Sequence, residues 1–188
     1  MKKRRIAYMT AAIAAAGTFT AMFVSGGERI PPADNVDLAR FMGDWYVIAT
    51  IPTFIEKDAY DALESYSLRE DGRVQTLYTQ RKGGFDGPAM TMRPVATVRD
   101  GTGNAVWGMQ FIWPIKAEYV IAYVSNDYTH TIVARSKRDY VWIMARTPSI
   151  TEETYASLVE RVRALGYDTE KLREVPQRPL EERDDDRD

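Results

Sequence analysis

The fold is decided by the stretch GDWYVIATIP at residues 43–52, where a glycine and a tryptophan two positions apart open a run of β-branched and aromatic residues. Such side chains favour an extended backbone, so residues 44–52 are expected to form the first β-strand. A Gly-x-Trp tripeptide occurs by chance in many chains, and a tryptophan on a strand is most often ordinary core. The weight of Gly43-Asp44-Trp45 therefore depends on the rest of the chain.

Seven further strand-like runs come after the first and end near Thr147. The eight predicted strands are residues 44–52, 60–70, 73–82, 88–99, 104–113, 117–125, 129–137 and 139–147. Short turns such as Asp71-Gly72 separate them, which implies antiparallel neighbours. Eight strands in a meander with no helix between them predict an all-β fold, an eight-stranded antiparallel up-and-down barrel. A sandwich of the same strands is the alternative.

The segments that flank the strands are expected to be helical or irregular. Residues 36–42 suggest a short helical turn, and a helix is predicted from the N-cap Thr151 to Gly166, with one apolar stripe that packs on the outside of the barrel. Residues 171–175 are expected to pair with the sheet edge. Residues 176–188 are rich in proline and charge, which predicts a solvated, disordered tail.

The N-terminus has the pattern of an export signal. Four basic residues at positions 2–5 precede a charge-free stretch at 6–24 and the small residues Ser25-Gly26-Gly27. This predicts either a cleaved signal peptide or an uncleaved signal anchor. The predicted organisation is a signal at 1–27, a linker at 28–35, a domain at 36–175 and a tail at 176–188.

Charge and cysteine content restrict the partners of the exported chain. Removing residues 1–27 takes away four basic residues and no acidic ones, which leaves 21 Lys and Arg against 27 Asp and Glu, a net charge of −6. This charge argues against nucleic acid and against an anionic membrane surface. The chain contains no cysteine, so it has no disulfide, no thiolate ligand and no residue to carry a lipoprotein's lipid.

Three separated motifs give the first one its meaning. Gly43-Asp44-Trp45 opens the first strand, Asn126-Asp127-Tyr128 lies between the sixth and seventh, and Arg146 ends the eighth. This order resembles the lipocalin family, in which a Gly-x-Trp, a Thr-Asp-Tyr type turn and a basic residue meet at the closed end of the barrel. Asn126 replaces the threonine, which leaves the turn chemistry intact.

A cation over an indole ring stabilises such a closed end, and its N–H groups can satisfy loop carbonyls. The resemblance therefore implies a structural role, with no catalysis, for the family motif. The motif residues are Gly43, Trp45, Asp127, Tyr128 and Arg146.

A narrower resemblance extends over residues 36–175. The run at 138–150, Val36-Asp37-Leu38 and Tyr66-Ser67-Leu68 resemble bacterial lipocalins and their apolipoprotein D relatives. The bacterial relatives are outer-membrane lipoproteins, and this chain departs from them because it lacks the lipidated cysteine. It is expected in the periplasm or secreted, or tethered by an uncleaved signal anchor.

Alternation along the strands gives the candidate ligand-binding residues, because every second side chain points into a barrel. With Trp45 and Arg146 inward, the interior is expected to be aromatic and rich in thioethers. Val47 stands where relatives carry an acid, so the deep pocket is expected to be apolar. The candidates are Val47, Ala49, Tyr78, Trp107, Met109, Phe111, Tyr119, Ile121, Tyr123, Tyr140, Trp142 and Met144.

The resemblance implies binding and transport or storage of small hydrophobic ligands in the bacterial cell envelope, with fatty acids or lysophospholipids as cargo. A filled barrel that only presents loops to a protein partner is one alternative, and a lipocalin-fold enzyme is another. His130 is the only histidine and lies in no hydrolase motif, so neither an active site nor a metal site is expected. No cofactor is expected, and a homodimer is left open.

Overall fold

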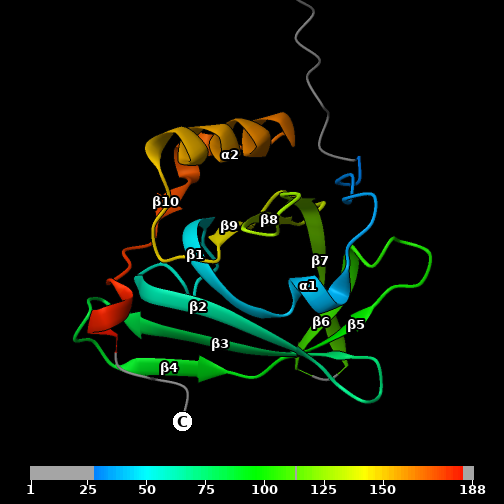
Figure 1. Cartoon of the computed structure of the whole chain (residues 1–188), viewed down its shortest axis with the longest axis horizontal. Helices are drawn as coiled ribbons and strands as arrows, with labels where there is room; N and C mark the ends of the chain where they lie inside the picture. Colours follow the sequence, from blue (N-terminus) through cyan, green and yellow to red (C-terminus); the bar gives the residue numbers. More distant parts are fainter. Residues whose placement is uncertain (1–27, 113, 184–188) are drawn as a thin grey trace, which may run out of the picture.

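The computed structural model describes residues 28–112 and 114–183, and the predicted signal at 1–27 lies outside them. The chain forms a closed antiparallel β-barrel with one long helix on its outside (Figure 1). The elements are α1 (Leu38–Phe41), β1 (Gly43–Ile51), β2 (Ala59–Leu68), β3 (Val74–Lys82), β4 (Ala89–Met92), β5 (Val95–Val98), β6 (Val106–Ile112), β7 (Ile115–Val124), β8 (His130–Ala134), β9 (Val141–Ala145), α2 (Glu152–Ala164), η1 (Thr169–Lys171), β10 (Arg173–Glu174) and η2 (Leu180–Glu182).

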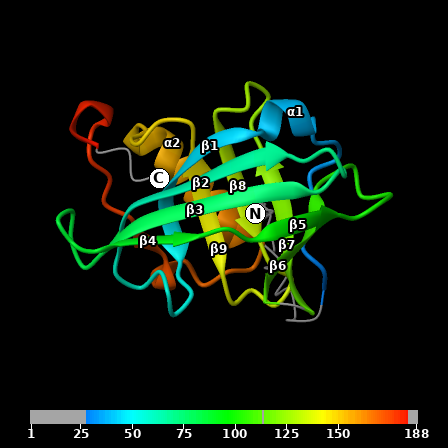
Figure 2. The ribbon, with the colours of Figure 1, turned by 90° about the horizontal axis from the view of Figure 1, so that it is seen from below.

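The paired strands are antiparallel, and β1 pairs with β2 on one side and with β9 on the other, which closes the barrel. Figure 2 shows β1, β2, β3 and β4 side by side in this order. Tyr46 lies opposite Ala145 in the closing pair. The closure rules out the sandwich and confirms the predicted barrel.

The fourth predicted strand is divided into two short strands. β4 pairs with the second half of β3, whereas β5 pairs with its first residues and with β6. Pro94 lies at the division and cannot donate a ladder hydrogen bond, although its carbonyl accepts one from the Thr76 amide at 2.9 Å. Together β4 and β5 occupy one of the eight strand positions of the barrel.

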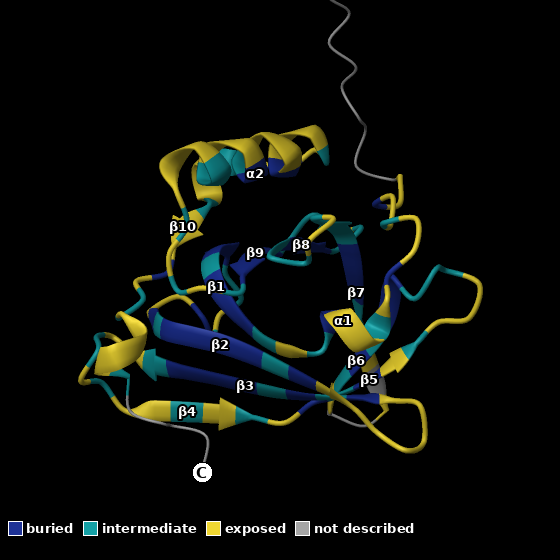
Figure 3. Cartoon of the chain, in the orientation of Figure 1, coloured by how far each residue is buried: buried dark blue, intermediate teal, exposed yellow. Residues whose placement is uncertain are grey.

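Two apolar clusters lie on opposite faces of the barrel wall. The interior cluster includes Trp45, Trp107 and Met144, whereas the second lies between the sheet and α2 and includes Ile143 and Leu158. Figure 3 shows α2 exposed on its far side and the strands beneath it buried. The predicted helix is confirmed, with Thr151 accepting from the Thr154 amide at 3.2 Å and Gly166 at φ +86° just past its end.

β1 pairs with β2 only over Gly43–Tyr46, which leaves a gap between the remaining parts of the two strands. The segment after α2 fills this gap. β10 pairs with β1 opposite Ala49 and Thr50, as expected for a sheet-edge element. The Gln177 side-chain amide then donates to the carbonyls of Val47, at 2.6 Å, and Ala62, at 3.1 Å. The chain thus bridges the two strands from the side.

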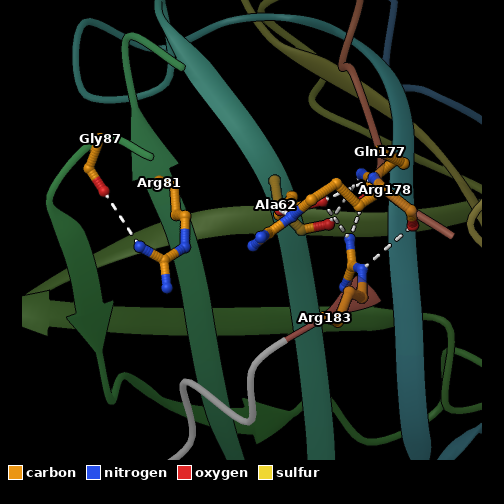
Figure 4. A network of polar contacts seen from close by, with 7 residues as sticks. Ala62, Arg81, Gly87, Gln177, Arg178 and Arg183 are labelled. Carbon is orange, nitrogen blue, oxygen red and sulfur yellow. Dashed lines mark hydrogen bonds and ion pairs between the residues drawn. The ribbon is translucent and has the colours of Figure 1, made fainter. Parts of the chain in front are cut away.

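The predicted disordered tail is wrong for residues 176–183. Asp61, which is buried, accepts from Arg178 at 2.6 Å and from Arg183 at 3.0 Å. Figure 4 shows Gln177, Arg178 and Arg183 gathered beside Ala62. Composition predicted solvation, but buried ion pairs hold this segment to the barrel. Residues 184–188 lie outside the described part of the chain.

Candidate functional site

The three family motifs meet at one end of the barrel. The Arg146 guanidinium carbon lies 3.8 Å from the centroid of the Trp45 ring. Arg146 also donates to the carbonyls of Asp44 and Arg40, each at 2.7 Å, and the Trp45 indole donates to the Phe41 carbonyl at 2.8 Å. This is the expected plug of a closed end, where a cation covers an indole and satisfies loop carbonyls.

Gly43 and the 126–128 turn complete this end. Gly43 has φ +90°, a conformation that favours glycine, and an added Cβ would lie 3.4 Å from Arg146 Nη1. The Tyr128 hydroxyl accepts from the Asp37 amide at 2.8 Å, at the N-terminus of α1. Asp127 accepts from Ser125 and Thr129, and these hydrogen bonds lower its pKa to about 2. All five motif residues thus lie in the structural floor.

Most of the candidate ligand-binding residues lie in the interior cluster. The nine in this cluster are Val47, Tyr78, Trp107, Met109, Tyr119, Ile121, Tyr140, Trp142 and Met144. The structure therefore brings these side chains together around one interior.

The expected inward placement of Ala49 and Tyr123 is wrong. Both pack in the cluster beneath α2, and the guanidinium of Arg161 lies 4.1 Å from the Tyr123 ring centroid. The pairing register shifts between Val47 and Ala49, and again between Ile121 and Tyr123. Each β-bulge inserts one residue and reverses which face the subsequent side chains occupy.

Phe111 also departs from the expected interior position. Its side chain is 56% exposed and belongs to neither cluster. The register shift between Met109 and Ile112 precedes the end of β6. Phe111 is therefore a surface residue beside the loop that joins β6 to β7.

The interior is not purely apolar, because a carboxyl group is buried in its wall. Glu64 lies on β2 opposite Trp45 and is 6% exposed. Its Oε2 accepts from the Tyr66 hydroxyl and, at 3.2 Å, from the Tyr119 hydroxyl, and these two hydroxyls also contact each other. The expectation of an apolar deep pocket, drawn from Val47, is therefore wrong, since the acid comes from the neighbouring strand.

The environment of Glu64 opposes its charge. Burial raises its pKa to about 7, and the charge of Glu56 adds to the rise, while the hydrogen bonds from Tyr66 and Tyr119 act against it. Burial and the charge of Glu64 in turn raise the pKa of both phenols. Among the described residues, no cation contributes to the pKa of Glu64. Within this part of the chain, the interior thus holds a carboxyl group without a counterion.

A second buried carboxylate lies toward the opposite end, in the loop that joins β1 to β2. Glu56 Oε1 accepts from the Trp142 indole at 2.8 Å, and Oε2 accepts from the Thr53 hydroxyl at 2.6 Å. Nearby, the Tyr78 hydroxyl donates to Gln80 at 2.5 Å. Because β1 runs from the plugged floor to this loop, Glu56 and Trp142 lie above Glu64.

Aromatic rings pack against one another between Glu56 and Glu64. Tyr119 stacks on Trp107, with ring centroids 5.5 Å apart, and on Trp142 at 6.1 Å. Tyr66 meets Trp107 edge-on at 5.6 Å. The interior therefore combines packed aromatic rings with buried carboxyl and phenol groups.

Neither Glu56 nor Glu64 is among the site residues expected from the sequence. Ala62, Glu64 and Tyr66 alternate along β2, and this alternation in phase with Trp45 is a signal that places Glu64 inward. Glu56 lies in an irregular loop, where no periodic pattern exists.

His130 opens β8, beside the 126–128 turn. Its Nδ1 lies 2.8 Å from the Thr129 hydroxyl. Within residues 28–112 and 114–183, no group of three or more His, Asp or Glu side chains is placed to hold a metal ion. Across the same residues, no helix has the length and apolar character to span a membrane.

Known proteins with similar sequences share this architecture. A family model described as a lipocalin-like domain matches residues 36–177. Temperature-induced lipocalin-1 of Arabidopsis thaliana is 33% identical over 155 residues, which cover 76% of this chain and 80% of that protein. The outer membrane lipoprotein Blc of Escherichia coli is 27% identical over 168 residues, which cover 85% of this chain and 93% of that protein. Apolipoprotein D of Bos taurus is 28% identical over 149 residues, with 76% and 77% coverage.

Solved structures with distant sequences have the same fold. Insecticyanin from the tobacco hornworm superposes with a TM-score of 0.62 at 13% identity, covering 80% of this chain and 91% of that one. Apocrustacyanin C2 gives 0.62 at 10% identity, with the same coverage. At these identities the likeness concerns the fold alone.

Proposed function

Because the chain belongs to the lipocalin family, whose members generally bind small hydrophobic molecules, we propose that it binds and carries a single-chain amphiphile inside its barrel. The observation that carries the proposal is the aromatic interior, in which Tyr119 stacks between Trp107 and Trp142 above a plugged floor. Flat, polarisable rings bind a hydrocarbon chain without demanding one particular shape.

Fatty acids and lysophospholipids are the proposed cargo classes, and the charge of the interior bears on the choice. A fatty acid bound with its carboxylate inward would meet Glu56 and Glu64, and no cation of the described residues contributes to the pKa of Glu64. Like charges that share a desolvated site repel each other. The interior therefore disfavours a fatty acid whose carboxylate points inward.

We propose that this binding serves the bacterial cell envelope. The similarity to an outer membrane lipoprotein supports the location, and so does the signal-like pattern at residues 1–27. Without a cysteine, the chain requires another route to the membrane or works unattached in the periplasm or outside the cell.

Tryptophan fluorescence tests the binding proposal directly. Delipidated protein is titrated with lysophospholipids and fatty acids of matched chain length. We expect saturable quenching or a spectral shift, because Trp107 and Trp142 line the interior. No spectral change with any member of the panel would refute ligand binding.

Dense packing near the floor favours a second candidate, a filled barrel that presents its loops to a protein partner. Phe41, Trp45 and Trp107 are almost completely buried, and the Phe41 ring contacts both indoles. A carrier holds a ligand in its interior, whereas a filled barrel holds none. Lipid that co-purifies with the native protein would exclude the filled barrel.

A further inference from the structure

The interior acid Glu64 has hydrogen-bonding capacity that the protein itself does not use. Within the described residues, every hydrogen bond to its carboxyl group goes to Oε2, from Tyr66 and Tyr119. Oε1 accepts none there, although the residue is only 6% exposed. Among the described residues the fully buried side-chain atoms without a partner are Arg135 Nε and Asp139 Oδ1, so Glu64 Oε1 keeps some exposure and is suited to a donor from a ligand.

The surroundings of Oε1 select the chemistry of that donor. The carboxyl group at Glu56 lies in the same interior and raises the negative potential around Glu64. The phenols of Tyr66 and Tyr119 present oxygen atoms on the same side, and the face of Tyr119 packs between two indole rings. Indole rings thus cover both faces of Tyr119, and the groups that face Oε1 are carboxyl and phenol oxygens, which together attract an organic ammonium.

The small remaining exposure of the interior side chains lies toward the end opposite the floor. Trp142 and Glu56 retain 9% and 8% exposure above it, whereas Trp45 and Phe41 in the floor retain none. Glu64 and Trp45 are directly opposite on β2 and β1, so the acid lies deep in the barrel. A ligand whose polar end reaches Glu64 therefore enters with that end first.

We propose that Glu64, with Tyr66 and Tyr119, binds the ammonium end of a cationic amphiphile inserted head-first, with its hydrocarbon chain directed past Trp142 toward the open end. This inference rests on the proposed function and names its ligand class. The ammonium donates to Glu64 Oε1 and lies beside the phenol oxygens of Tyr66 and Tyr119. Glu56, bound to the Trp142 indole and Thr53, supplies a second negative charge nearer the entrance.

Dodecylamine, dodecan-1-ol and dodecanoate test the proposal, because they share one chain and differ only in the head. Calorimetric titration of the delipidated full chain is performed near pH 8, where Glu64, with a pKa of about 7, is ionised and an alkylammonium is still protonated. We expect dodecylamine to bind roughly 10-fold or more tightly than dodecanoate, with dodecan-1-ol between them. Equal or tighter binding of dodecanoate overturns the proposal and leaves the carrier function standing.

Glu64→Gln supplies the matched test of the residue, because it keeps the side-chain shape and removes the charge. We expect it to weaken dodecylamine binding roughly 10-fold or more and to leave dodecan-1-ol within about twofold. Glu153→Gln removes the same charge from the exposed start of α2 and is expected to change neither. Equal losses for Glu64→Gln and Glu153→Gln overturn the proposal, and no binding of any dodecyl compound by the wild type overturns the carrier function as well.

Discussion

Trp45 and Glu64 are directly opposite each other on paired strands, yet they have different roles. Trp45 is fully buried under Arg146 and closes the floor. Glu64 holds a carboxyl group in a desolvated interior, where no cation of the described residues affects its pKa. The glycine and tryptophan motif therefore identifies the scaffold, and the side chains above it determine what the scaffold can bind.

The buried acid predicts a pH dependence of stability. The pKa of Glu64 is raised from 4.5 to about 7 in the folded protein. Between these values the folded chain binds one proton more than the unfolded chain, so the free energy of unfolding falls as the pH rises. The fall is about 3 kcal/mol over this window and ends above about pH 7. Urea denaturation at a series of pH values measures it.

Glu64→Gln is the control for this pH dependence, because an amide does not titrate. The phenols of Tyr66 and Tyr119 stay neutral in this window, since burial raises their pKa. The pKa of Asp127 is lowered to about 2, so this group titrates at more acid pH. An unchanged pH slope in Glu64→Gln would show that another group is responsible.

A pair of substitutions separates ligand binding from barrel closure. Trp142→Asp places a third carboxylate in the interior and removes an aromatic wall, so lysophospholipid affinity is expected to fall roughly 10-fold or more. Arg146→Ala removes the cation over Trp45 and the hydrogen bonds to loop carbonyls, so the free energy of unfolding is expected to fall by about 2 kcal/mol. For each variant, fluorescence titration measures the ligand affinity and urea denaturation measures the free energy of unfolding. Equal losses of affinity at matched folded fraction would contradict the assigned roles.

At the scale of elements, bulges determine which predictions from the sequence succeed. Alternation placed Val47, Trp142 and Met144 correctly in the interior, because no irregularity separates them from the floor. It failed at Ala49 and Tyr123, because the bulges in β1 and β7 leave no clear mark in residue type. Eight strands, the closing motif and α2 were therefore predictable, whereas the faces of residues beyond a bulge were not.

The outer cluster predicts that the helix stabilises the barrel without taking part in binding. Leu158 on α2 is 3% exposed and packs in the cluster with Ile143. Leu158→Ala is therefore expected to lower the free energy of unfolding by about 2–4 kcal/mol and to leave ligand affinity unchanged. Denaturation and titration of one preparation measure both, with the exposed Glu153→Gln as the control. A large loss of affinity in fully folded Leu158→Ala would show that α2 shapes the interior.

At the scale of the whole molecule, the barrel is completed by a segment from the far end of the chain. Residues 173–178 occupy the side of β1 that β2 leaves unpaired, and Val175 reaches the interior cluster. The pairing of residues 173–175 was expected, but charge and proline content gave no sign of the contacts that follow, because these are tertiary. Asp61 has φ +50° and lies at the register shift of β2. Its carboxylate forms ion pairs with Arg178 and Arg183.

Asp61→Asn tests this lateral closure with little change in backbone preference, since asparagine also tolerates a positive φ. The substitution removes the buried negative charge that Arg178 and Arg183 both contact, so the free energy of unfolding is expected to fall by about 3 kcal/mol. Hydrogen exchange should rise most at residues 173–183. Asp58→Asn, on an exposed residue of the preceding loop, is the control. Unchanged exchange at 173–183 would show that Asp61 does not hold the segment.

Native mass spectrometry of the protein purified from its own cells tests the central claim, which is that the barrel interior carries a small hydrophobic ligand. We expect the wild type to carry one co-purified amphiphile, identified after extraction, and Trp142→Asp to carry little or none. Wild-type protein that shows only the mass of the polypeptide, and that takes up no amphiphile when one is added, would contradict the claim.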